Sequence, residues 1–237
     1  ILTLRDQKAK ILGYKNHAEY VLAEKIAKHP QTVEKFLVGN LAKLKIDHRN
    51  LIKKIEKVKG SKIEYFDYEY YFNEFIKSNY SVDESEIKEY FELNNVLSEI
   101  FKLFGSLFKV SFVRNTEIKL WHEDVFMFDV LDGGKKVAHL MFDLFPRKGK
   151  YGHACHWSMA HGSHRTDIEG YEAPTSVVIA NYSKATKQNP TLLTFWDVEA
   201  FYHEFGHACH ALLTRARYGS QSGTSVRQDF VETPSQL

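Results

Sequence analysis

The sequence has 237 residues, of which 43% are hydrophobic and 26% are charged, so it is long enough to bury a core and is not a disordered polymer. Its 32 Lys and Arg residues nearly cancel its 30 Asp and Glu residues, and the net charge of +2 argues against a nucleic-acid partner. The sequence contains no apolar run of about 18 residues, so it predicts no membrane span. The two cysteines, Cys155 and Cys209, offer no disulfide framework, so we expect a reducing compartment, the cytoplasm.

The first half of the sequence predicts helices. Apolar residues recur there at intervals of three or four, with lysines between them on the outer faces. The segments with this pattern are 9–12, 16–28, 32–58, 64–78 and 83–109. The many aromatic side chains of the last two segments have helical spacing, which favours packing between helices over stacking on bases.

The hydrophobic period changes after Arg114. Residues 125–131 and 136–145 alternate or run apolar on either side of Asp132-Gly133-Gly134. These three residues tolerate positive φ and are typical of a hairpin turn between two strands. Residues 175–182 predict a third strand, so a small sheet is expected in this part of the chain.

The segment 197–216 predicts an amphipathic helix that carries His203-Glu204-Phe205-Gly206-His207. Two histidines four residues apart lie on one helix face, one turn apart, and can hold a single metal ion. A catalytic zinc ion takes three protein ligands and leaves its remaining position to water. Glu204, next to the first histidine, is the candidate general base that takes a proton from that water.

The motif does not supply its own third ligand. The long metzincin pattern requires Gly three residues and His six residues after the second histidine, but His210 and Leu213 stand there. A carboxylate from a later segment is the alternative. Glu232 follows His207 by 25 residues, and spacing alone does not choose between Glu232 and Asp229.

The two motifs together carry a resemblance to a known family. HEFGH at 203–207, followed by DFVETPSQ at 229–236, resembles the thimet oligopeptidase family of zinc peptidases, which includes oligopeptidase A and the bacterial dipeptidyl carboxypeptidases. The similarity covers nearly the whole chain. Further segments that agree with the family are 80–83, 89–91, 121–124, 143–154 and 222–224.

The resemblance implies a site and a fold. One Zn²⁺ per chain is expected, held by His203 and His207 and by the glutamate of the second motif, which matches Glu232. The implied fold is mainly α with a small β-sheet (α+β), in which a zincin-like helix lies beside the sheet. We expect a helical region at 1–114 and, at 115–237, the sheet with the zinc helix and the third-ligand segment.

The resemblance also implies that the chain is an internal fragment of a larger, mostly helical, two-lobed peptidase. The sequence begins with Ile1 rather than Met, and it leaves undecided whether a targeting segment precedes it. In the family, the histidine and tyrosines that stabilise the oxyanion come from a later part of the chain. Short peptides are the implied substrates, but little activity and weak zinc binding are expected of this chain alone.

Two alternative functions stay open. One is a dipeptidyl carboxypeptidase of the same family. The other is a non-catalytic helical interaction module with a structural metal site, for which Asp229 or His210 would supply the fourth ligand. Neither alternative requires a membrane, and the sequence does not set the oligomeric state.

A cluster of histidines and one cysteine upstream of the zinc helix is a rival site. It lacks the paired spacing of zinc fingers, so a structural or substrate-side role is favoured over a second zinc site. Its members are His153, Cys155, His156, His161 and His164. The segment 219–225, rich in Gly and Ser, is either a plain linker or a mobile loop over the cleft.

Overall fold

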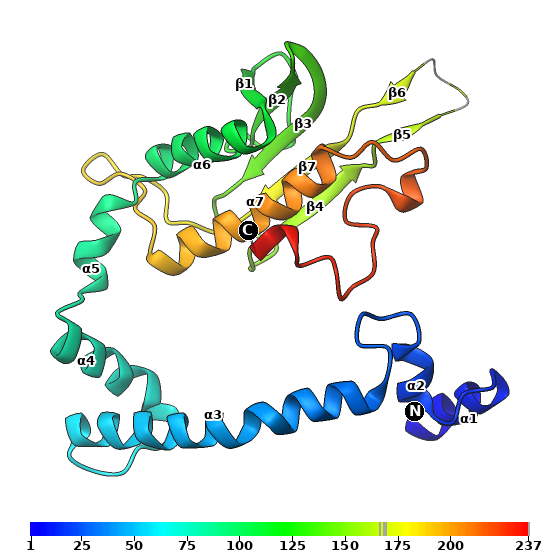
Figure 1. The fold of residues 1–237 in the computed structure, drawn as a ribbon. Helices are drawn as coiled ribbons and strands as arrows, with labels where there is room; N and C mark the ends of the chain where they lie inside the picture. The colour runs from blue at the N-terminus through cyan, green and yellow to red at the C-terminus, as the bar shows by residue number, and fades with distance from the viewer. Residues whose placement is uncertain (166, 168–169, 237) are drawn as a thin grey trace. The chain divides into compact units, whose positions relative to one another are not determined.

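The structure is a computed structural model that describes residues 1–165, 167 and 170–236. The chain forms two compact units, Ile1–Asp83 and Glu84–Leu237 (Figure 1). None of the helices in the described residues has the length and apolar character needed to span a bilayer.

The first unit is helical. It contains α1 (Leu2–Ile11), α2 (His17–Leu22), α3 (Pro30–Lys59), the 3₁₀ turn η1 (Tyr65–Asp67) and α4 (Tyr68–Tyr80). Helix α3 begins with Pro30 in its first turn and ends at Gly60, whose φ of 77° is left-handed. Both are typical helix boundaries. The predicted helix 16–28 is shorter in the structure, because the chain turns after Leu22 and Lys28 has a φ of 62°.

The second unit contains the sheet and two long helices. Its helices are α5 (Glu84–Ile87), α6 (Leu93–Phe108) and α7 (Phe195–Leu212), with the 3₁₀ turns η2 (Lys88–Tyr90), η3 (Gly219–Gln221) and η4 (Pro234–Gln236). Its strands are β1 (Val110–Asn115), β2 (Phe126–Asp132), β3 (Lys135–Asp143), β4 (Cys155–Ala160), β5 (Ser163–His164), β6 (Tyr171–Glu172) and β7 (Thr175–Ile179).

Five of these strands form one mixed sheet in the order β1-β2-β3-β7-β4. Strands β3 and β7 are parallel, and the other neighbours are antiparallel. The predicted hairpin joins β2 to β3, and Gly133 and Gly134 have φ values of 55° and 81°. The remaining two strands, β5 and β6, pair only with each other among the described residues.

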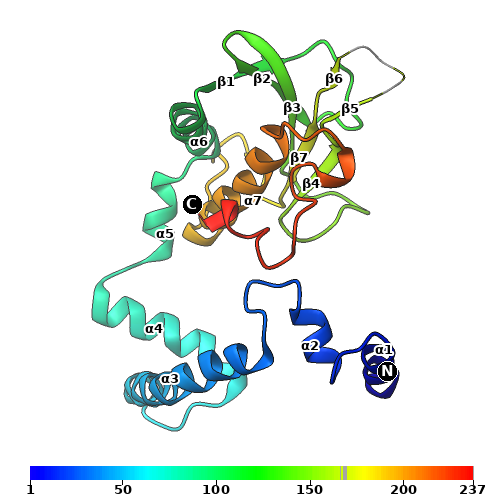
Figure 2. The ribbon, with the colours of Figure 1, turned by 45° about the vertical axis from the view of Figure 1, so that its right-hand side comes forward.

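Helices α6 and α7 share the main core with the sheet (Figure 2). Phe142 of β3 is fully buried and lies against Phe201 and Phe205 of α7. Phe104 of α6 contacts Phe205 at a centroid distance of 4.8 Å. Because side chains alternate along a strand, Met141 of β3 belongs to a separate cluster with Met127 and Val177.

The α+β fold class is confirmed, with the HEFGH helix beside a small sheet. Two strands of the five-stranded sheet were not predicted, and neither was the short pair β5 and β6. β1 lies in a segment assigned to the helical region, and β4 lies inside the histidine cluster. The predicted division at residue 114 falls inside β1, because the change from helix to strand comes after Phe108. The compact units divide after Asp83, because α6 packs on β1.

Candidate metal centre

Helix α7 holds the HEFGH residues in a fixed orientation. A capping box starts the helix, in which Thr194 Oγ1 accepts a hydrogen bond from the Asp197 backbone N–H and Asp197 accepts one from the Thr194 N–H. The pattern T-x-x-D at 194–197 is a known helix-start signal. The predicted helix began at residue 197 and did not include this signal. Phe201 and Phe205 are buried on the sheet side, which leaves the histidines to face away from this core.

Three side chains that can bind a metal meet at α7. Glu232 Oε2 lies 3.3 Å from His203 Nε2 and 3.1 Å from His207 Nε2. The three possible ligand atoms all lie within 4.8 Å of one another. No other group of three His, Cys, Asp or Glu side chains in the described part of the chain gathers its ligand atoms in this way.

Two of the three ligand-atom distances are close to those around a zinc ion, and the group as a whole spans up to 4.8 Å. Zinc binds imidazole nitrogen and carboxylate oxygen at about 2.0–2.2 Å, and a tetrahedron with such bonds has ligand atoms about 3.3–3.5 Å apart. The two distances from Glu232 to the histidines are close to this edge length. Two imidazoles and one carboxylate are also a donor set found in catalytic zinc sites.

The structure distinguishes among the acidic and histidine candidates that spacing left open. It brings Glu232, and not Asp229, to the two histidines. His210 lies outside the group, with its ring 6.4 Å from the ring of Phe230. The two sequence motifs therefore bring three possible metal ligands together, and Asp229 and His210, the candidates for a fourth ligand, lie outside this group.

The carboxylate of Glu232 is held in its charged form. The Ser235 hydroxyl donates to Glu232 Oε2 over 2.9 Å. This hydrogen bond, together with the neighbouring His207 and His203, lowers the pKa of Glu232 below its usual value. A deprotonated carboxylate is the form that binds a metal.

Glu204 is anchored to the sheet. The backbone N–H of His156, in β4, donates to Glu204 Oε2 over 2.6 Å. This bond fixes one carboxylate oxygen of Glu204, and the other oxygen remains available to accept a proton. Strand β4 thus orients the candidate base, a role that the sequence did not reveal.

His156 itself is a half-buried neutral residue and belongs to no second group of possible metal ligands in the described part of the chain. Its Nε2 lies 3.0 Å from Ser176 Oγ, and its ring lies 6.3 Å from the ring of His207. Burial, followed by the nearby His207 and His210, lowers the pKa of His156 to about 4. The alternation of polar His156 and Ser158 with apolar Trp157 and Met159 is the period-2 signal that could have predicted β4, although the apolar residues are the exposed ones in the structure.

The rest of the histidine cluster forms no second metal group among the described residues. Both cysteines are free, and burial raises the pKa of the thiols of Cys155 and Cys209. The preference for a structural or substrate-side role over a second zinc site stays a prediction.

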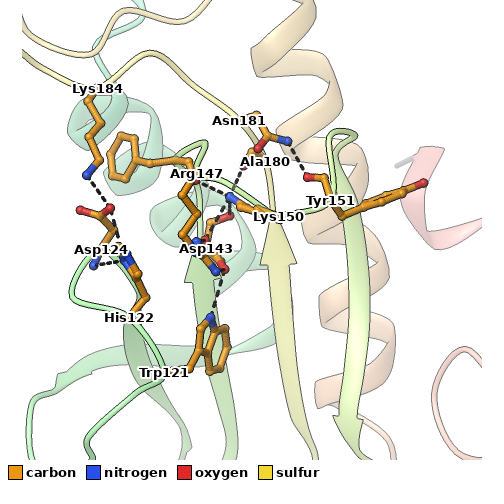
Figure 3. Close-up of polar contacts among 11 residues, drawn as sticks. Trp121, His122, Asp124, Asp143, Arg147, Lys150, Tyr151, Ala180, Asn181 and Lys184 are labelled. Atoms are coloured by element: carbon orange, nitrogen blue, oxygen red, sulfur yellow. Dashed lines mark hydrogen bonds and ion pairs between the residues drawn. The ribbon is translucent and has the colours of Figure 1, made fainter.

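A buried ionic network fixes the ends of β3 and β7, next to the start of β4 (Figure 3). Lys150, whose side chain is 4% exposed, donates to the carbonyls of Asp143, Phe145 and Ala180 over 2.5–2.8 Å. Asp143 accepts two hydrogen bonds from Arg147 and lies 3.0 Å from the Lys150 ammonium. These contacts hold the segment that leads into β4.

Opposing effects set the charge states in this network. Burial alone would raise the pKa of Asp143, but hydrogen bonds from Arg147, Lys150 and Trp121 outweigh it and lower the pKa to about 2. Burial lowers the pKa of Lys150, and Asp143 partly opposes that effect. Asp143 is therefore ionised at neutral pH and offsets the buried cation.

The segment 219–225 is packed rather than a free linker. Ser222 is 1% exposed, and a Cβ on Gly223 would lie 2.6 Å from the Ala211 Cα of α7. The Gly223 N–H donates to Thr214 Oγ1 over 3.3 Å. The simple linker interpretation was wrong, because composition does not show that this glycine contacts a helix backbone.

Comparison with known proteins agrees with these motifs. The sequence matches the family model for peptidase family M3 over residues 1–237. It is 36% identical to a thimet-like oligopeptidase of Dictyostelium discoideum, over 99% of this chain and 37% of that protein. It is 32% identical to saccharolysin of Saccharomyces cerevisiae, over 100% of this chain and 36% of that protein.

A third relative is a dipeptidyl carboxypeptidase of Salmonella typhimurium, 32% identical over 100% of this chain and 35% of that protein. The chain thus spans about a third of the length of the curated relatives it matches. Since the family match extends over the whole sequence, the chain belongs to peptidase family M3.

Proposed function

We propose that this chain carries the zinc site of a peptidase that hydrolyses peptide bonds in short oligopeptides. His203, His207 and Glu232 hold the zinc, and Glu204 is the general base. The observation that carries the proposal is the meeting of three ligand atoms within 4.8 Å on the helix that also presents Glu204. Membership of family M3 supports the same assignment.

Each residue has a defined task in this reaction. A zinc ion in such a site lowers the pKa of a bound water to about 7 and polarises a carbonyl. Glu204, held by the His156 N–H, takes the proton from the attacking water and can pass it to the leaving amine. The hydrogen bond to β4 keeps the carboxylate from rotating away during this transfer.

The sheet supports an extended peptide as the substrate. β4 is an edge strand in the described sheet, and its His156 is the residue that anchors Glu204. A peptide added along a sheet edge binds through its backbone, so many side chains are accepted. The names of two relatives, an oligopeptidase and a dipeptidyl carboxypeptidase, support peptides as substrates and leave the position of the cleaved bond open.

Metal analysis of single variants tests the ligand assignment. In titrations with added zinc, the unchanged chain and Glu204→Gln should bind the metal with similar, weak affinity, and Glu232→Ala should bind it much more weakly. Asp229→Asn is the matched control, because it removes the rival carboxylate three residues away. Zinc loss in Asp229→Asn together with retention in Glu232→Ala would overturn the ligand set.

A cleavage assay at high protein concentration tests the base. We expect slow hydrolysis of a quenched short peptide by the zinc-loaded chain, and none by Glu204→Gln or by the chelator-treated chain. Product analysis on peptides of graded length separates internal cleavage from release of C-terminal dipeptides. Equal zinc-dependent rates for the unchanged chain and Glu204→Gln would show that Glu204 is not the general base. The absence of zinc-dependent hydrolysis by the unchanged chain would favour the non-catalytic metal-binding module.

A further inference from the structure

The turn η4, which follows Glu232 in sequence, lies directly on α7 beside the proposed ligands (Figures 1 and 2). The chain leaves α7 after Leu212 and returns across the same helix at Pro234 and Ser235. Because Glu232 lies in an irregular segment, no strand or long helix fixes its side chain. Contacts between η4 and α7 must therefore set its position.

Gly206 makes this crossing possible. A Cβ at this position would lie 2.5 Å from the Pro234 carbonyl oxygen and 2.8 Å from the Ser235 Cα. Backbone atoms cannot move aside as the end of a flexible side chain can, so a methyl group here would push the crossing segment away from α7. The glycine inside the HEFGH motif thus lets the third ligand approach the first two.

Ser235 orients the carboxylate once the segment has docked. Its side chain is 9% exposed, and its Oγ lies 2.9 Å from both the Glu232 backbone carbonyl and Glu232 Oε2. A hydroxyl has one hydrogen, so it donates to one of these oxygens at a time. Oε2 is also the oxygen that faces both imidazoles, at 3.3 Å and 3.1 Å.

We propose that Ser235 is a positioning residue that holds the Glu232 carboxylate toward the metal, on a segment that Gly206 admits to the face of α7. The inference rests on the zinc site of the proposed function. Glu232 is 58% exposed at its side chain, so without this hydrogen bond the carboxylate is free to rotate into solvent. Partners of metal ligands typically change affinity by about 10–100-fold when they are removed.

Zinc affinity, measured on the purified chain by competition with a chromogenic chelator, tests the inference. Ser235→Ala should weaken zinc binding by about 10-fold or more. Ser163→Ala is the matched control, because Ser163 is also 9% exposed but lies in β5, outside the site. It should leave the affinity unchanged.

Ser235→Thr and Ser235→Val separate orientation from packing. The two side chains have nearly the same shape, so any cost of fitting them is shared, and only Thr keeps the hydroxyl. Ser235→Thr should bind zinc more tightly than Ser235→Val, and the ratio of their affinities should be about the same as the ratio between the unchanged chain and Ser235→Ala. Thermal unfolding without metal should be alike for the two variants.

The outcomes distinguish the inference from the function on which it rests. If the unchanged chain binds zinc no better than His203→Ala does, the proposed site is wrong and the inference falls with it. If the unchanged chain binds zinc and Ser235→Ala binds it equally well, the site stands and the inference is wrong. Equal affinities for the Thr and Val variants overturn it in the same way.

Discussion

Two helices of this protein, α3 and α7, have similar sequence patterns and very different surroundings. Along α3, all of which the structure describes, Ile55 alone is buried, and Phe36 and Leu37 are 69% and 60% exposed. α7 is shorter, yet it buries Phe201 and Phe205 against the sheet and α6. Helical periodicity predicts a helix in both segments, but only neighbouring elements make one of them rigid enough to hold a site.

The largest expected difference between these helices is in core packing. Phe205→Ala removes a fully buried ring that lies 4.8–6.3 Å from four other phenylalanine rings, and should lower the free energy of unfolding of the second unit by about 3–5 kcal/mol. The three tryptophans all lie in residues 84–237, so urea unfolding followed by fluorescence reports on this unit.

Leu37→Ala is the control in α3. Its change in unfolding free energy, followed by circular dichroism, should stay within about 0.5 kcal/mol. A large loss in α3 together with a small one in α7 would reverse the comparison between the two helices.

Acid should weaken the network that holds the segment leading into β4. The pKa of Asp143 is lowered to about 2, against about 3.9 in an unfolded chain, so its contribution is present above about pH 4 and is lost as the pH falls toward 2. The free energy of unfolding of the unchanged chain, relative to Asp143→Asn, should decrease by about 2 kcal/mol between pH 6 and pH 2.

Asp132→Asn is the control for the acid prediction. It removes a carboxylate that is 50% exposed and pairs with Arg215. Exposed pairs contribute about 0–1 kcal/mol, so a small difference at every pH is expected. A pH-independent gap between the unchanged chain and Asp143→Asn would contradict the network's role.

Glycine to alanine changes should have opposite signs in the two helices. Gly39 of α3 has no atom within 4 Å of an added Cβ, and Gly39→Ala should stabilise the helix by about 0.5–1 kcal/mol through helix propensity. Gly206→Ala gains the same propensity but forces the Pro234 carbonyl away.

A net destabilisation of the second unit by about 1–3 kcal/mol is therefore expected for Gly206→Ala, with weaker zinc binding. Thermal unfolding and the chelator competition measure the two effects. A stabilised Gly206→Ala variant with unchanged zinc affinity would show that the crossing segment does not dock on α7.

The smallest expected difference lies at the helix starts. Thr194→Ala removes the side-chain cap of α7 and should cost about 1 kcal/mol. His29→Ala, at the N-cap residue before α3, removes no capping hydrogen bond and should have almost no effect. Thermal unfolding of both variants measures the two changes in stability. Equal losses of stability would contradict the predicted difference between the helix starts.

The outcomes at particular residues show where sequence reasoning works. Asp132-Gly133-Gly134 predicted its hairpin because positive φ at two adjacent positions is a local requirement that few residues meet. The helix around HEFGH was predicted for a similar reason, since its apolar spacing is local. β4 was missed because its alternating pattern is short and its histidines suggested metal binding, although His156 is half-buried and neutral.

The sequence by itself determined the helix that bears His203, Glu204 and His207, the hairpin and the resemblance to a peptidase family, because spacing and turn chemistry are properties of short segments. The resemblance also implied Glu232 as the third ligand, which spacing alone did not choose over Asp229, and the structure brings Glu232 to the histidines. Only the tertiary structure decided that His156 anchors Glu204 and that Gly206 lets the returning chain contact α7. These contacts join residues up to 48 positions apart, and their geometry depends on the packing of the sheet and η4 against α7.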